Sequence, residues 1–347
     1  MSDDVTIIAP IGRREFLAGL ATAGAAALVP DVLFGAQARP AAAVTPYRID
    51  VHYHGNSPGF IAAIKAHNTG QTALMNWTPA KALEDMDRDG VATSIMSTSE
   101  PSVWFGDVAA ARALARECNE YAARLVADRP TRFGMFATLP LPDVDGTLRE
   151  IEYAFDTLKA DGACFMSSYE GKYLGDPKFA PVMDELNRRK AVCYTHPFRG
   201  AMMNMLPDGR ALGITLTTET TLTIQSILYT NTATRCPDIR FIWSHGGGTA
   251  PYITSRLGAG IGPDGQPSAN MAAMRKFYYD TAQAFNEYTL ATFTKVVPNS
   301  HILFGTDYPF AQAGTVAKGL ADYRFAAADL RAIARDNALE LFPRLKK

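Results

Sequence analysis

Two histidines separated by one residue end a short apolar segment of the chain, Arg48-Ile49-Asp50-Val51-His52-Tyr53-His54. Ile49 and Val51 favour a strand, in which side chains two residues apart share a face and have Cα atoms roughly 6.6 Å apart. His52 and His54 could therefore hold one metal ion between their ring nitrogens, at about 2.0–2.1 Å from each nitrogen. Because this spacing also arises by accident, the metal interpretation depends on what the rest of the chain carries.

Three further residues that can bind a metal follow apolar segments in the same way. His196 ends Ala-Val-Cys-Tyr-Thr, His245 ends Phe-Ile-Trp-Ser and precedes three glycines, and Asp307 follows Ile-Leu-Phe-Gly-Thr. Taken singly, each has a plain structural explanation as a polar strand end, a loop residue or a helix cap. Taken together, they predict one metal site built from the ends of four strands. His67 and His301 lie outside this pattern, and we expect both to be ordinary surface residues.

The segments that carry these residues alternate with helical patterns from Tyr47 onward. We expect eight strands: Arg48–His54, Ala92–Thr98, Phe133–Leu139, Ala163–Ser168, Ala191–His196, Arg240–His245, Phe277–Thr281 and Ile302–Thr306. Helical patterns cover Val108–Asp128, Thr147–Lys159, Ala180–Arg189, Thr217–Thr234 and Glu287–Val296. Eight such units without a break in composition predict an α/β fold, a (β/α)₈ TIM barrel, which carries its chemistry at the C-terminal ends of its strands. The alternative is an open doubly wound sheet, although no G-x-G-x-x-G follows a predicted strand.

Two connections are long for a compact barrel. Gly55–Pro79 follows the first predicted strand, and Phe198–Leu216 follows the fifth. Loops of this length are usually functional or disordered, and the loops after barrel strands surround the active site. We therefore expect both connections to form walls of a substrate pocket.

The composition narrows the classes of function. Of the 347 residues, 47% are apolar and 20% are charged, as in a soluble globular protein with an ample core. A formal net charge of −1 without a Lys/Arg-rich run gives no electrostatic basis for binding nucleic acid or an anionic membrane. The cysteines are scattered without a C-x-x-C pair, so we expect no disulfide framework; they are Cys118, Cys164, Cys193 and Cys236.

The first 45 residues differ from the rest of the chain. Arg13-Arg14 precedes Phe-Leu and an Ala/Gly/Leu-rich run, and Ala36-Gln37-Ala38 forms an A-x-A cleavage site. This pattern resembles a twin-arginine export signal. We predict a signal peptide and spacer at 1–45, a catalytic domain at 46–347, export by the twin-arginine machinery to the periplasm, and no stable membrane span after removal of the signal. An amphipathic helix belonging to the domain is the alternative.

At this point the sequence resembles a known family. His52-x-His54, Thr195-His196-Pro197, Ser244-His245-Gly246-Gly247 and Gly305-Thr306-Asp307-Tyr308-Pro309 are similar to motifs of the amidohydrolase superfamily, in its amidohydrolase-related (type 2) branch. That branch includes the aminocarboxymuconate semialdehyde, resorcylate and methylsalicylate decarboxylases. The resemblance extends from Tyr47 to Pro343, and it includes Ser168–Pro177.

The resemblance implies roles for the residues that match it. It implies that the metal ligands are His52, His54, His196 and Asp307, and that His245 is a catalytic acid or base that acts with Asp307. Many relatives hold two metals bridged by a modified lysine on the fourth strand, but Ala163–Ser167 contains no lysine. We therefore expect one divalent metal ion. Zn²⁺ is the first choice because three imidazoles and a carboxylate suit it, and Mn²⁺ is the alternative.

The residues that would contact a substrate have weaker sequence signals than the metal ligands. Arg199 could clamp a carboxylate with two hydrogen bonds, or be a solvated loop residue. Trp104, Tyr169 and Phe198 could wall an aromatic ring, or be ordinary packing. Asp280 could orient His245, or simply end the seventh strand.

Three functions fit this pattern. The first is a metal-dependent, non-oxidative decarboxylase of a small aromatic or unsaturated carboxylic acid. The second is a hydrolase of a lactone, ester or amide, because the same ligands can activate water against a carbonyl group. The third is a non-catalytic periplasmic protein that binds a metal or small ligand. The expected partner is a small-molecule carboxylate or lactone, and a homodimer is compatible with the sequence.

Overall fold

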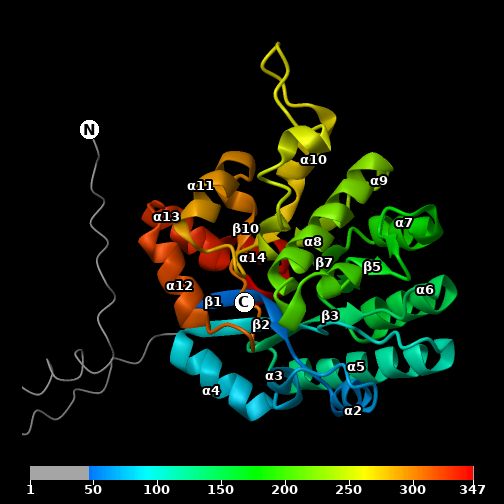
Figure 1. The fold of residues 1–347 in the computed structure, drawn as a ribbon. Helices are drawn as coiled ribbons and strands as arrows, with labels where there is room; N and C mark the ends of the chain where they lie inside the picture. Colours follow the sequence, from blue (N-terminus) through cyan, green and yellow to red (C-terminus); the bar gives the residue numbers. More distant parts are fainter. Residues whose placement is uncertain (1–46, 347) are drawn as a thin grey trace, which may run out of the picture. The chain divides into compact units, whose positions relative to one another are not determined.

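Eight parallel strands pair in the order in which they occur along the chain, β1-β2-β3-β4-β7-β8-β9-β10, and helices surround them (Figure 1). The strands are β1 (Arg48–His54), β2 (Val91–Ser97), β3 (Phe133–Thr138), β4 (Gly162–Met166), β7 (Val192–His196), β8 (Arg240–Trp243), β9 (Tyr278–Asp280) and β10 (Ile302–Leu303). This computed structural model describes residues 47–346, so the predicted signal peptide and spacer at 1–45 lie outside the described residues.

The segment after β10 closes the sheet onto β1. The amide of Val51 donates to the carbonyl of Phe304 at 3.0 Å, and the amide of Asp307 donates to the carbonyl of His52 at 2.9 Å. Tyr53 and Tyr308 form a parallel bridge just beyond these bonds. Closure removes the exposed sheet edges, and the predicted (β/α)₈ barrel is confirmed.

The helices lie on the outside of the barrel and are in large part set by local sequence signals. They are α2 (Pro58–Ala66), α3 (Thr72–Met75), α4 (Pro79–Asp89), α5 (Val108–Asp128), α6 (Val144–Glu152), α7 (Ala180–Arg188), α8 (Leu212–Tyr229), α9 (Thr232–Arg235), α10 (Ala269–Lys276), α11 (Glu287–Val296), α12 (Ala313–Asp322), α13 (Ala327–Arg331) and α14 (Asn337–Leu341). Asp107 caps α5 by accepting from the amide of Ala110 at 2.7 Å, and Thr78 caps α4 ahead of a proline at its first position. Gly90, at φ 72°, ends α4 immediately before β2.

Strands β3, β4 and β7 are buried along their whole length, as expected for parallel strands covered on both faces. Several predicted strands, β8 and β10 among them, are longer in the sequence pattern than in the structure. β8 ends at Trp243 rather than at His245, because His245 has a φ of 52° and begins a 3-10 turn. β10 ends at Leu303 rather than at Thr306, because the residues after it pair with β1 instead.

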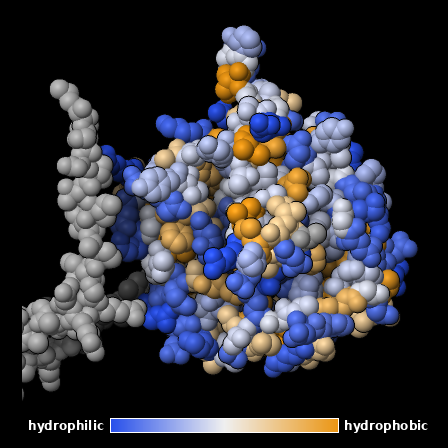
Figure 2. Space-filling view, in the orientation of Figure 1, coloured by the Kyte–Doolittle hydropathy of each residue, from blue (hydrophilic) through white to orange (hydrophobic). Residues whose placement is uncertain are grey.

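The two long connections contain short helices and turns rather than irregular loop alone. Gly55–Pro79 contains α2 and α3, and Phe198–Leu216 contains two short 3-10 turns, Ala201–Met205 and Pro207–Gly209, before α8 begins. Among the described residues, no helix is long and apolar enough to cross a bilayer. The face seen in Figure 2 is mostly hydrophilic, and its apolar patches are small and separate.

Candidate metal centre and active site

The two histidines of β1 meet Asp307 inside the barrel. His52 and His54 are both fully buried, and their ring centroids lie 5.2 Å apart. The Nε2 atom of each ring lies 3.1 Å from Oδ1 of Asp307, which stands in the segment that closes the barrel onto β1. The spacing of two along one strand and the closure of the sheet therefore bring these three residues together.

His196 completes the cluster from β7. Its Nδ1 donates to the carbonyl of Pro197 at 2.8 Å, which leaves Nε2 to face the other side chains. One ligand atom from each of His52, His54, His196 and Asp307 lies within 4.8 Å of the others, and all four residues are buried. This cluster could bind a divalent metal ion.

The shifts in pKa at His196 and Asp307 favour the forms that bind a metal. Burial alone would lower the pKa of His52, but the carboxylates of Asp280 and Asp307 raise it to about 10, so a metal ion would displace a proton from that ring. Burial lowers the pKa of His196 well below its ordinary value, and the neighbouring histidines lower it further. Burial alone would raise the pKa of Asp307, but contact with His52 and the hydrogen bonds from the histidines hold it well below its ordinary value. A neutral imidazole and an ionised carboxylate are the forms in which these side chains bind metals.

One buried atom in the cluster has no protein partner. Nε2 of His52 makes no hydrogen bond, although it faces Asp307. On the other side of the same ring, Nδ1 donates to Oδ2 of Asp280 at 2.8 Å, which holds the hydrogen on Nδ1 and leaves the lone pair of Nε2 for a ligand. An unpartnered nitrogen of this kind fits a metal ion in the cluster.

Asp280 also supports His245, although through the backbone rather than through the ring. Its Oδ1 accepts from the amide of His245 at 2.9 Å and from the amide of Ala282 at 3.0 Å. Asp280 ends β9, and its two oxygens fix the ring of His52 and the turn after β8 relative to each other. The ring that contacts its carboxylate is that of His52, whereas the sequence had suggested an orienting role toward His245 alone.

The turn that carries His245 requires the glycines that follow it. His245 lies at φ 52°, its Nε2 lies 3.4 Å from Oδ2 of Asp307, and its Nδ1 has no partner among the described residues. Gly248 has φ 65° and ψ −127°, and a Cβ atom there would lie 2.1 Å from the carbonyl oxygen of Thr217 in α8. Glycine at this position therefore lets α8 pack against the His245 turn.

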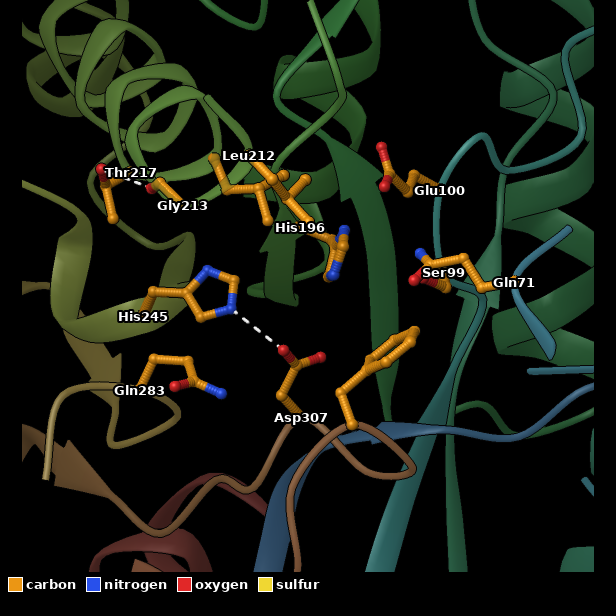
Figure 3. Close-up of a pocket in the computed structure, with 12 residues that line it drawn as sticks. Gln71, Ser99, Glu100, His196, Leu212, Gly213, Thr217, His245, Gln283 and Asp307 are labelled. Carbon is orange, nitrogen blue, oxygen red and sulfur yellow. Dashed lines mark hydrogen bonds and ion pairs between the residues drawn. The ribbon is translucent and has the colours of Figure 1, made fainter. Parts of the chain in front are cut away.

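A cavity of about 320 Å³ opens beside the cluster (Figure 3). Its wall comprises Gln71, Ser99, Glu100, His196, Leu212, Gly213, Leu216, Thr217, His245, Gln283, Asp307 and Phe310. His245 and Gln283 lie on one side of the cavity, and Ser99 and Glu100 lie on the other (Figure 3). The two long connections thus supply Gln71, Leu212, Gly213 and Leu216 to the wall.

Arg199, expected to clamp a carboxylate, is not among the residues that line this cavity. Its backbone amide donates to Oε2 of Glu100 at 2.8 Å, and its Nε is paired with Oε1 of the same carboxylate. An arginine that is already paired with a buried carboxylate is poorly placed to clamp a second one. Glu100 lines the cavity instead.

The three aromatic residues expected to hold a ring also lie outside the cavity wall. Tyr169 is buried, and its hydroxyl accepts from the amide of Met166 at 2.9 Å. Trp104 packs against a separate apolar cluster beneath α5, and Phe198 packs against the barrel core. Tyr169 is therefore a buried packing residue, whereas Trp104 and Phe198 are half-buried against apolar clusters outside the cavity wall.

Phe310, Leu212 and Leu216 form the apolar part of the wall in their place. Phe310 stands three residues after Asp307, and Glu100 stands two residues after the second predicted strand, so both carry a sequence signal. Gln71 lies in the first long connection, which was predicted to form a wall, whereas Gln283 carries no sequence signal. The two histidines left out of the site lie elsewhere, as His67 is exposed and stacks on Phe105 at 4.1 Å, while His301 is half-buried.

A comparison with known families identifies the family to which this chain belongs. The family model described as Amidohydrolase matches residues 49–344. The chain belongs to the amidohydrolase family. The resemblance predicted from the four motifs is therefore confirmed, and it covers the whole barrel of this amidohydrolase from β1 to the end of α14.

Curated relatives resemble the chain along most of its length. Decarboxylase yanB of Aspergillus niger is 34% identical over 330 residues, which cover 86% of this chain and 88% of the relative. The 6-methylsalicylic acid decarboxylase acuB of Aspergillus aculeatus is 35% identical over 327 residues, which cover 86% of this chain and 97% of the relative.

A solved structure shares the fold. The dihydroxybenzoic acid decarboxylase of a Polaromonas species, determined with bound manganese and an inhibitor, superimposes with a TM-score of 0.73. It is 22% identical in sequence, and the match covers 87% of this chain and 98% of that chain.

Proposed function

We propose that this amidohydrolase is a metal-dependent, non-oxidative decarboxylase that acts on a small aromatic or unsaturated carboxylic acid. The observation that carries the proposal is the similarity over 86% of the chain to fungal proteins named decarboxylases. The buried cluster of three histidines and one aspartate, beside a cavity that fits a single ring, agrees with it. Ligand cavities in proteins commonly measure about 300–1,000 Å³, so a cavity of about 320 Å³ suits a small substrate.

His52, His54, His196 and Asp307 would hold one divalent ion. Three imidazoles and a carboxylate suit Zn²⁺, which is the first choice, and the manganese in the Polaromonas relative supports Mn²⁺ as the alternative. β4 contains no lysine that could bridge two metals. When bound, the ion would supply Lewis acidity that fixes the carboxylate and a neighbouring oxygen of the acid.

His245 and Asp307 would supply the proton that replaces CO₂. Loss of CO₂ breaks a C–C bond, and a proton must then be delivered to the carbon that carried the carboxylate. His245 lines the cavity, its Nε2 lies 3.4 Å from Oδ2 of Asp307, and the hydrogen bond from its backbone amide to Asp280 fixes the position of the turn. It can therefore hold a proton at Nε2 facing the reacting carbon and exchange it with solvent afterwards.

Export and assembly are proposed from the sequence. Arg13-Arg14 and Ala36-Gln37-Ala38 support a twin-arginine signal, passage through the twin-arginine machinery and residence in the periplasm. A homodimer is compatible with the composition.

The proposal is tested by assaying the metal-loaded protein in the absence of oxygen against a panel of hydroxybenzoates and lactones. We expect CO₂ to be released from at least one aromatic acid and no ring opening of the lactones. Turnover of a lactone, ester or amide without CO₂ release would make the protein a hydrolase. Tight metal binding with no turnover of any of them would favour a binding protein.

A further inference from the structure

Glu100 is a buried carboxylate at the cavity wall that the metal cluster does not use. It follows β2, its side chain is 6% exposed, and it lies across the cavity from His245 (Figure 3). Burial raises the pKa of Glu100, the charge of Arg199 opposes this rise, and the charge of Asp307 adds to it. Burying a carboxylate costs free energy unless it is paired and hydrogen-bonded, and Arg199 supplies that pairing for Glu100.

The pair formed by Glu100 and Arg199 crosses the mouth of the barrel. Glu100 follows β2 and Arg199 follows β7, and β3 and β4 lie between these strands in the sheet. The cavity wall contains no residue from 101 to 195 among those that the structure describes. Glu100, which Arg199 holds in place, thus forms the boundary of the cavity on the side of β3 and β4.

The carboxylate of Glu100 retains capacity to accept hydrogen bonds. Arg199 donates one bond to each oxygen, its amide to Oε2 and its Nε to Oε1, and each carboxylate oxygen can accept two. Ser99, the preceding residue, lines the same cavity, and its hydroxyl is buried without a partner in the described part of the chain. An acceptor and an unpartnered hydroxyl side by side match the hydrogen-bonding needs of a substrate hydroxyl group, which can donate to the first and accept from the second.

We propose that Glu100 and Ser99 form a hydroxyl subsite that determines substrate specificity. This inference rests on the proposed function, and it adds that the acid carries a second hydrogen-bond donor, a ring hydroxyl or amino group, at the end of the ring away from the metal cluster. The negative charge of Glu100 repels the carboxylate of the acid, so that group is directed toward the metal cluster and His245. Leu212, Leu216 and Phe310 cover the ring between these two ends.

The test measures binding rather than turnover. Salicylate and the dihydroxybenzoates that move a second hydroxyl around its ring are titrated into the metal-loaded protein by calorimetry. A hydrogen bond to a charged group corresponds to about tenfold to hundredfold in affinity. We expect at least one dihydroxybenzoate to bind about tenfold or more tightly than salicylate, and its methoxy counterpart to lose that gain.

The variant Glu100→Gln removes the charge and keeps the size of the side chain, and we expect it to reduce this preference to within about threefold. Glu150→Gln is the matched control, because Glu150 is also a buried carboxylate paired with an arginine, Arg116 at 2.9 Å, and it lies outside the cavity wall. The control is expected to keep the preference of the wild-type protein. If Glu100→Gln fails to load metal, Glu100→Asp retains the charge and withdraws the carboxylate by one methylene group, and it is expected to reduce the same preference.

The proposal is overturned if no second hydroxyl position improves binding to the wild-type protein, or if the preference survives in the variant that loads metal. The binding preference can be measured whether or not the protein releases CO₂, so the subsite and the proposed decarboxylation are tested separately. A preference that depends on Glu100 in a protein that releases no CO₂ would support the subsite and refute the proposed decarboxylation. Release of CO₂ without such a preference would support the decarboxylation and refute the subsite.

Discussion

Gly248→Ala is the perturbation that most directly tests how α8 packs against the His245 turn. The new Cβ atom would lie 2.1 Å from the carbonyl oxygen of Thr217, whereas Cβ atoms in proteins essentially never approach another atom within 3.0 Å. The backbone of α8 or of the turn must therefore retreat by about 0.9 Å. Thr217 lines the cavity, and His245 stands three residues before Gly248, so either movement disturbs the site.

Two costs add in this variant. A residue other than glycine at φ 65° and ψ −127° costs about 1–3 kcal/mol, and overpacking costs about another 1–3 kcal/mol. The sum is about 2–6 kcal/mol in the free energy of unfolding. For a barrel of roughly 300 residues, 1 kcal/mol shifts Tm by about 1.6 °C, so we expect a fall of about 3–10 °C.

Gly265→Ala is the matched control. Gly265 also has a positive φ, 75°, but a Cβ atom there would meet nothing within 4 Å. It should therefore bear the conformational cost alone, about 1–2 kcal/mol, and lower Tm by about 2–3 °C. Thermal unfolding of the metal-loaded variants measures this difference.

Turnover and metal content separate a local effect from a general one. A displacement of about 1 Å at a catalytic group can cost about 10²-fold in rate, so we expect Gly248→Ala to lose about that much turnover. Its metal content should remain unchanged, because none of the four residues of the metal cluster lies on this turn. Equal Tm values for the two alanine variants, with full turnover in both, would refute the close packing of α8 on the turn.

Three further predictions concern the metal, the proton and export. His245→Asn should keep the metal and lose about 10²–10⁴-fold in turnover, whereas His54→Ala should lose the metal; an empty site in both would show that His245 is a ligand. Elemental analysis of loaded protein should approach one divalent ion per chain, and removing it with a chelator should abolish turnover and lower Tm; an ordered pair of metals would contradict this. Changing Arg13 and Arg14 to lysine should retain the precursor in the cytoplasm, and unchanged export in a fractionation assay would exclude the twin-arginine route.

The strands were predictable because their burial on both faces leaves a pattern in the sequence. Phe133–Thr138 and Val192–His196 are apolar runs, and the structure has them as β3 and β7. The end of β8 was predicted wrongly. Apolar residues before His245 indicate a strand, but the positive φ of His245 depends on its packing against α8 and on its hydrogen bond to Asp280, which are distant in sequence.

The metal cluster could be predicted residue by residue, whereas for the substrate wall only the two long connections could be predicted and most of the individual side chains could not. Residues at the ends of barrel strands converge whatever the loops do, so His52, His196 and Asp307 could be grouped from the sequence. The wall depends on which loop side chains pair with one another. Arg199 is withdrawn from the cavity by Glu100, a residue 99 positions away, and no local pattern contains that information.

The fate of solvent atoms tests the central claim, that the reaction breaks a C–C bond. The metal-loaded protein is given an aromatic acid that it consumes, once in D₂O and once in water labelled with ¹⁸O, and the organic product is analysed by mass spectrometry and NMR. We predict one solvent deuterium on the carbon that lost CO₂, and no ¹⁸O in the organic product. One ¹⁸O atom in a new carboxylate, with no deuterium on carbon, would identify hydrolysis and contradict the account.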